Sequence, residues 1–153
     1  MLRLEEPIRD LAHLLWGAAC AFLITACATS PLPYRVHGDA IDEPLTTQPG
    51  SAERGREVVI GHDANCLLCH SIPETGQRFM GNVAPPLSGV AMRLTPAQIR
   101  LRVVDPTRVK PDVAMPAYYR TYGLDRVMEQ YRGKPVLTAQ QIEDVVAYLS
   151  TLR

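Results

Sequence analysis

The pentapeptide Cys-Leu-Leu-Cys-His at residues 66–70 limits what this chain can fold into more than any other feature. On a helical turn Cys66 and Cys69 are three positions apart, and His70 is four positions from Cys66, so all three side chains project to one side. C-x-x-C-H is the signature for attachment of a c-type haem, in which the thiols form thioethers and the imidazole binds iron. The motif therefore predicts one covalently attached haem c, held by Cys66, Cys69 and His70.

Other interpretations of the cysteine pair need features that the chain lacks. A thioredoxin-like redox motif would need a βαβ pattern around it, and a zinc site would need a second Cys/His cluster. A disulfide between two cysteines on one turn would be sterically awkward, and it remains an alternative. Among 153 residues there are only six Tyr, two Phe and one Trp, so a haem would fill the core that aromatic side chains do not.

Charge and composition exclude some classes of protein. Sixteen Lys and Arg balance sixteen Asp and Glu, which excludes the basic footprint of a nucleic-acid-binding domain. Thirteen prolines and ten glycines favour many loops and little regular sheet.

The N-terminus resembles an export signal. Residues 11–26 are almost uncharged and largely apolar, but at sixteen residues they are short of the roughly 20 that span a membrane. There are two hypotheses for the cleavage site. The segment from Ile24 to Cys27 resembles a lipobox, which would leave Cys27 as a lipid anchor. The segment from Ala26 to Ala28 resembles an ordinary signal-peptidase site. We favour the lipobox, and thus predict a signal sequence over 1–27 and a periplasmic, membrane-tethered protein.

Residues 28–51 are predicted to be a flexible linker, because prolines and polar residues follow no helical or strand period there. The folded domain is predicted over 52–153. Within it, Thr95 and Thr138 each precede a Gln by three residues, which is the pattern of a capping box. The sequence predicts four helices, over residues 52–60, 95–103, 118–131 and 138–152. No segment alternates as a strand would, so the prediction is an all-α fold with long loops.

The second axial ligand of the iron has several candidates. They are the following residues: His37, His62, Met80, Met92, Met115 and Met128. Met115 stands out, because Pro116 keeps it out of a helix and its loop could fold over the distal face. His62 is expected to be a surface histidine and Met128 a core residue. Ligation by His70 and Met115 would raise the reduction potential and leave no open position on iron, which suits electron transfer.

Several features resemble class I cytochromes c. In that family a glycine on the N-terminal helix packs near an aromatic residue of the C-terminal helix, and Gly55 and Tyr148 are the matching positions. The loop Ala-Pro-Pro-Leu-Ser-Gly at 84–89 resembles the family's G-P-x-L-x-G. By this resemblance the Pro85 carbonyl would accept the ring N–H of His70 and fix the imidazole.

A narrower resemblance, over residues 84–90, 115–119 and 133–148, is to SoxX, the monohaem subunit of the SoxAX complex of bacterial sulfur oxidation. SoxAX is similar to an L-cysteine S-thiosulfotransferase, which joins thiosulfate to a cysteine of the SoxYZ carrier. The resemblance implies an electron-transfer subunit that binds a SoxA-like cytochrome and passes electrons to another cytochrome c. The reactive cysteine would belong to SoxA.

The chain by itself is expected not to be catalytic, since no cysteine is left as a nucleophile and no catalytic constellation can be placed. The alternatives are a free-standing periplasmic cytochrome c shuttle, and a haem enzyme or sensor with an open iron position. Four tyrosines lie close together in the sequence and could face a partner or pack around the haem edge. They are Tyr118, Tyr119, Tyr122 and Tyr131.

Overall fold

The computed structural model describes residues 34–153. The predicted signal sequence and the cleavage site at Cys27 lie outside the described residues. Within 34–153, no helix is long and apolar enough to cross a membrane.

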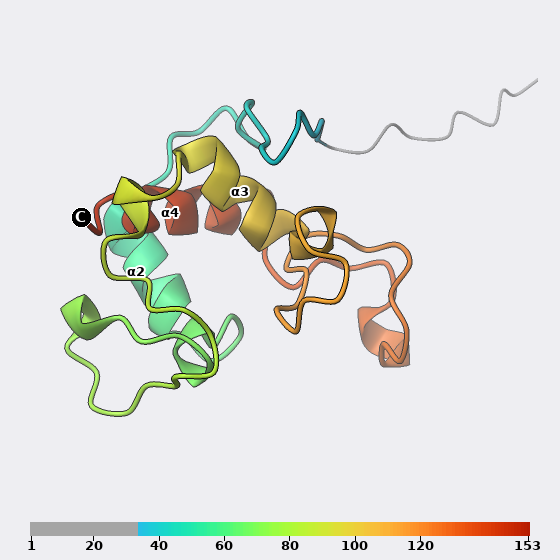
Figure 1. The fold of residues 1–153 in the computed structure, drawn as a ribbon. Coiled ribbons are helices and arrows are strands. Elements are labelled where there is room, and N and C mark those ends of the chain that lie inside the picture. The colour runs from blue at the N-terminus through green and yellow to red at the C-terminus, as the bar shows by residue number, and fades with distance from the viewer. Residues whose placement is uncertain (1–33) are drawn as a thin grey trace, which may run out of the picture. The chain divides into compact units, whose positions relative to one another are not determined.

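Three α-helices form the framework of the described domain (Figure 1). They are α2 (Ala52–Ile60), α3 (Pro96–Val104) and α4 (Ala139–Leu149). Long irregular segments with short 3-10 turns connect them, and residues 34–153 contain no strand beyond an isolated bridge between His37 and Ala40. The prediction of an all-α fold with long loops is therefore confirmed.

Local sequence signals explain where α3 and α4 begin. Each helix starts with a complete capping box, Thr95 with Gln98 and Thr138 with Gln141, in which each side chain bonds the backbone N–H of the other residue. These reciprocal bonds satisfy N–H groups that have no partner within the helix.

α2 and α4 cross in close contact at Gly55. A Cβ atom on Gly55 would lie 1.8 Å from the backbone oxygen of Asp144 and 2.8 Å from the Cβ of Tyr148. Only a residue without a side chain allows this approach. The crossing is the one that the cytochrome c resemblance implies for Gly55 and Tyr148.

The core lies between the three helices. α4 contributes its apolar face, and α2 and α3 pack against it with Val59, Ile99, Leu101 and Val104, all fully or almost fully buried. The face of α4 consists of Ile142, Val145, Val146 and Leu149.

The segment before α2 packs on this core. Ile41 is only 1 % exposed, and its carbonyl accepts a hydrogen bond of 2.7 Å from Arg100, which also pairs with Glu143 at 2.8 Å. Tyr34 is buried as well. The folded domain therefore extends back to Tyr34, before the predicted boundary at residue 52, and a linker remains a prediction for residues 28–33.

The predicted helix over 118–131 is wrong. Its first backbone N–H groups, on Tyr118 and Tyr119, bond to the carbonyls of Val103 and Val104 at the end of α3. Gly123 and Arg126 both have positive φ, which no α-helix accommodates. Only a 3-10 turn, Glu129–Tyr131, forms in this segment.

The expectation that Met128 is a core residue is also wrong. With no helix there to bury one face, its side chain is 60 % exposed.

Candidate cofactor site

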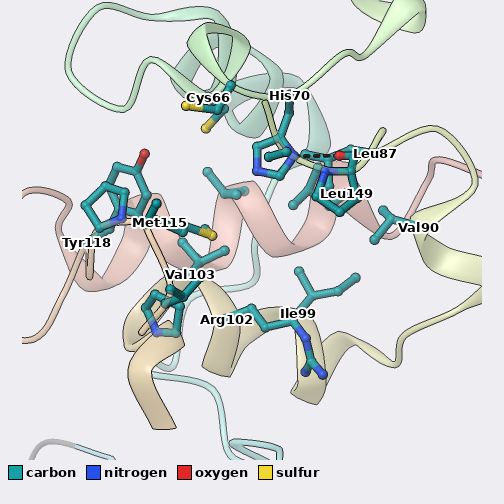
Figure 2. A pocket seen from close by; sticks show the side chains of 18 of the residues that line it. Cys66, His70, Leu87, Val90, Ile99, Arg102, Val103, Met115, Tyr118 and Leu149 are labelled. Carbon is teal, nitrogen blue, oxygen red and sulfur yellow. Dashed lines mark hydrogen bonds between the residues drawn. The ribbon is translucent and has the colours of Figure 1, made fainter. Parts of the chain in front are cut away.

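A cavity of about 750 Å³ opens between the helices and the long loops. Its volume lies in the range of cofactor pockets, roughly 300–1,000 Å³. All five residues that the sequence nominates for the site line this cavity, and Figure 2 shows it from close by. They are Cys66, Cys69, His70, Pro85 and Met115.

The cysteine turn, Cys66–Leu68, is a tight 3-10 turn. Asn65 precedes it in the left-handed conformation, and the N–H groups of Cys69 and His70 both bond to the Cys66 carbonyl. This geometry places both thiols and the imidazole on the cavity. The two cysteines are not joined by a disulfide. Burial raises the pKa of the Cys66 thiol to about 11, so it is protonated at neutral pH.

A strap over residues 81–87 lies against the cysteine turn. The Gly81 N–H donates to the Leu67 carbonyl at 2.7 Å and the Ala84 N–H to the Cys69 carbonyl at 3.0 Å. A Cβ on Gly81 would lie 2.0 Å from the Leu68 carbonyl oxygen, so glycine is needed at this contact. The strap brings Pro85 to the imidazole.

His70 is oriented by a backbone carbonyl. Its Nδ1 lies 2.7 Å from the oxygen of Pro85 (Figure 2). Because a carbonyl only accepts, the proton sits on Nδ1 and the lone pair of Nε2 remains available for a metal ion. The contact is the one that the resemblance implies for Pro85.

Met115 lies half-buried in the cavity lining, and Figure 2 shows its sulfur pointing into the space that Cys66 and His70 also border. None of the other candidates for the second axial ligand lines the cavity. His62 is fully exposed, as expected, and Met80 accepts a hydrogen bond from the Ile72 N–H. The remaining candidates also lie elsewhere: His37, Met92 and Met128.

The four tyrosines that follow Met115 are expected either to face a partner or to pack around the haem edge, and their environments differ. Tyr118 is buried, lines the cavity, and donates a hydrogen bond of 2.7 Å from its hydroxyl to the Ala64 carbonyl. Burial is the main cause that raises the pKa of Tyr118 to about 12. Tyr119 packs against the ring of Tyr34. Tyr122 and Tyr131 are exposed.

Basic side chains at the cavity are a feature that the sequence reasoning missed. Arg93, Arg102 and Lys110 line it, together with the acidic Asp112. The sequence could have indicated Arg102. It follows the buried Ile99 by three residues and therefore lies on the same side of α3.

These observations fit a haem c. An apolar cavity of this size offers two thiols on one turn, an imidazole with a free Nε2, and a thioether that borders the same space. Residues 34–153 contain no group of three or more His, Cys, Asp or Glu side chains that could hold a metal ion.

Comparison with known proteins agrees with this chemistry. A family model described as Cytochrome c matches residues 52–153. A chain in the crystal structure of SoxXA from P. pantotrophus is 37% identical to this chain, with a TM-score of 0.72; the match covers 78% of this chain and 93% of that one. No curated protein matches significantly.

The family match covers the cysteine turn, all three helices and the loop of Met115. Cytochromes c bind their haem covalently, and this chain has one C-x-x-C-H motif, so it carries one covalent haem c. The chain thus belongs to the cytochrome c family, and within that family it is SoxX-like.

Proposed function

We propose that this chain is the electron-transfer subunit of a periplasmic, SoxAX-like thiosulfate-oxidising complex. The observation that carries the proposal is the match to a chain of SoxXA at 37% identity over 93% of that chain. The cavity supports it, because its lining offers two thiols, an imidazole and a thioether, which would suit a haem c used for electron transfer.

The positions of the residues that line the cavity support a role for each of them. Cys66 and Cys69 would hold the haem covalently through two thioethers, each formed by addition of a thiol S–H across a vinyl group, and His70 and Met115 would bind its iron. Haem iron with a His/Met pair takes up and releases one electron at a time. The Pro85 carbonyl fixes the ring of His70, and the largely apolar lining would keep water from the bound iron.

The oxidation itself takes place on the partners. A thiol of a SoxYZ-like carrier and thiosulfate join through a new S–S bond, with loss of one proton and two electrons. A SoxA-like cytochrome supplies the reactive cysteine for this transfer. The present chain accepts the electrons in single steps and passes them to a downstream cytochrome c.

The N-terminal residues fit a protein held at a membrane. Residues 1–27 act as a lipoprotein-type signal, Cys27 becomes the lipid anchor, and residues 28–33 link the anchor to the domain. Together they would hold the cytochrome on the periplasmic side of a membrane.

Anaerobic mixing tests the proposed electron path. Haem-loaded chain in its oxidised form is combined with the SoxA-like partner and the carrier, and thiosulfate is then added. We expect the visible spectrum of this chain's haem to change to the reduced form only in the complete mixture. Carrier whose cysteine has been alkylated is the matched control and should give no reduction.

Two results would contradict the proposal. If the haem stays oxidised in the complete mixture, the chain does not take electrons from this reaction. If it is reduced equally fast without the SoxA-like partner, the chain is a free-standing electron shuttle.

A further inference from the structure

The backbone of the loop that carries Met115 makes few hydrogen bonds. Residues 114–117 form no hydrogen bond with any described residue. The nearest bond before them, from the Val113 N–H to the Lys110 carbonyl, stays within the same loop. The side chain of Met115 packs against the core, and the backbone after it is next fixed at Tyr118.

Tyr118 is fixed to three separate parts of the fold. Its N–H donates to the Val103 carbonyl at the end of α3, at 3.1 Å, and its carbonyl accepts from the Leu137 N–H before α4, at 2.9 Å. Its hydroxyl donates to the Ala64 carbonyl at 2.7 Å. The side chain is 8 % exposed, so water competes little for this last bond.

The hydroxyl bond reaches the cysteine turn. Ala64 is itself buried and lies two residues before Cys66. Among the described residues, no other hydrogen bond or ion pair joins residues 52–92 to residues 105–137. Figure 2 shows Tyr118 at the side of the cavity, next to Met115 and with its hydroxyl directed away from Val103.

We propose that Tyr118 is a positioning residue that keeps the Met115 thioether in place opposite His70. Its hydroxyl sets the separation between the cysteine turn, to which the haem is attached, and the loop of Met115. This inference rests on the proposed role of Met115 as an axial ligand.

The test replaces Tyr118 with Phe in the haem-loaded full chain. Tyr118→Phe keeps the ring and both backbone bonds, so only the bond to Ala64 is lost. The rate at which added imidazole binds ferric iron is measured, because imidazole binds only after the methionine has left. The net contribution of one neutral hydrogen bond corresponds to roughly a twofold to twelvefold change in rate, and we expect imidazole binding to accelerate by a factor in that range. The Met–iron charge-transfer band should weaken as well.

Tyr119→Phe is the matched control, since the hydroxyl of Tyr119 makes no hydrogen bond with any described residue. It should leave the imidazole rate unchanged. Incorporation of para-aminophenylalanine at position 118 returns an N–H donor and should restore the wild-type rate. Should Tyr118→Phe fail to accumulate in loaded form, 4-fluorophenylalanine at position 118, which partly fills the space of the hydroxyl without supplying a donor, gives the same comparison.

The outcomes separate the two proposals. A wild-type protein without the Met–iron band would overturn the axial role of Met115. A wild-type protein with that band, and an imidazole rate that Tyr118→Phe does not change, would overturn the positioning role alone. Equal acceleration by Tyr119→Phe would also overturn it, because the effect would then be a general loosening of the fold.

Discussion

His70 shows how one backbone contact determines the chemistry of a side chain. The Pro85 carbonyl accepts from Nδ1 at 2.7 Å, and this contact favours the tautomer in which the lone pair of Nε2 is available to a metal ion. Met115 borders the same cavity, and the other histidines and methionines of the described domain do not.

The proposed role of Met115 as an iron ligand can be tested by removing its thioether. Met115→Ala removes the only methionine thioether in the cavity lining, so the oxidised protein should lose its Met–iron charge-transfer band and bind added imidazole at once. Its reduction potential should fall, because His/Met ligation raises it. Visible spectra and a redox titration measure both effects.

Met92→Ala is the control for this prediction, because Met92 is 72 % exposed and lies away from the cavity. A Met115→Ala protein that keeps the band would show that another residue supplies the sixth ligand.

The stability of the three-helix framework depends on the close approach of α2 to α4. Gly55→Ala would place a Cβ within 1.8 Å of the Asp144 carbonyl oxygen, so the helices must move apart. We expect a loss of about 3 kcal/mol in the free energy of unfolding, at the upper end for an overpacked core. Denaturant unfolding followed by circular dichroism measures it.

Glu57→Ala changes an exposed position on the same helix and should alter the free energy of unfolding by less than about 0.5 kcal/mol. Equal stability of Gly55→Ala and wild type would mean that α2 and α4 do not cross at this residue.

An ion pair between α2 and α4 makes stability depend on pH. Burial by itself would raise the pKa of Asp144, but the Arg54 guanidinium and the Ser51 N–H outweigh burial and lower it. A lowered pKa stabilises the fold above the unfolded value, about 3.9, and this stabilisation is lost as pH falls through the folded pKa. Asp144→Asn should therefore be less stable than wild type at neutral pH.

The difference between Asp144→Asn and wild type should shrink as pH falls below about 4, when the carboxylate of the wild type takes up a proton. Unfolding curves of both proteins between neutral and acidic pH measure the trend. A difference that stays constant with pH would show that the charge of Asp144 does not stabilise the crossing.

The sequence predicts α2, α3 and α4 well because their signals are local. Capping boxes and apolar spacing lie within each segment, and the C-x-x-C-H motif carries its chemistry within five residues. The segment over 118–131 could not be predicted in this way, because the partners of Tyr118 and Tyr119 are carbonyls of α3, distant in sequence. The proposed role of Tyr118 depends on Ala64, which lies still farther away, 54 residues earlier in the sequence.

The limits of the folded domain differ from those expected from composition. Proline-rich, polar residues around Ile41 indicate a linker, yet Ile41 inserts into the core and its carbonyl is held by the buried Arg100. Composition reports an average over many residues, whereas one buried side chain is enough to fix a segment to a domain.

Ile41→Ala tests this boundary. Truncation of a fully buried isoleucine costs about 2–5 kcal/mol in the free energy of unfolding, whereas the same change in a free linker would cost almost nothing. Thr47→Ala, at an exposed position of the same segment, is the control. Denaturant unfolding of the haem-loaded proteins distinguishes these outcomes. If Ile41→Ala leaves the free energy of unfolding unchanged, the segment around Ile41 is a linker and not part of the domain.

The proposal that this cytochrome works within a thiosulfate-oxidising complex is tested most directly by isolating it from its own cells. Full-length, haem-loaded protein with a C-terminal affinity tag would be recovered from cells grown on thiosulfate. We predict that a SoxA-like cytochrome is retained in equal amount. Recovery of the haem-loaded chain alone would contradict the proposal and leave a free-standing electron carrier.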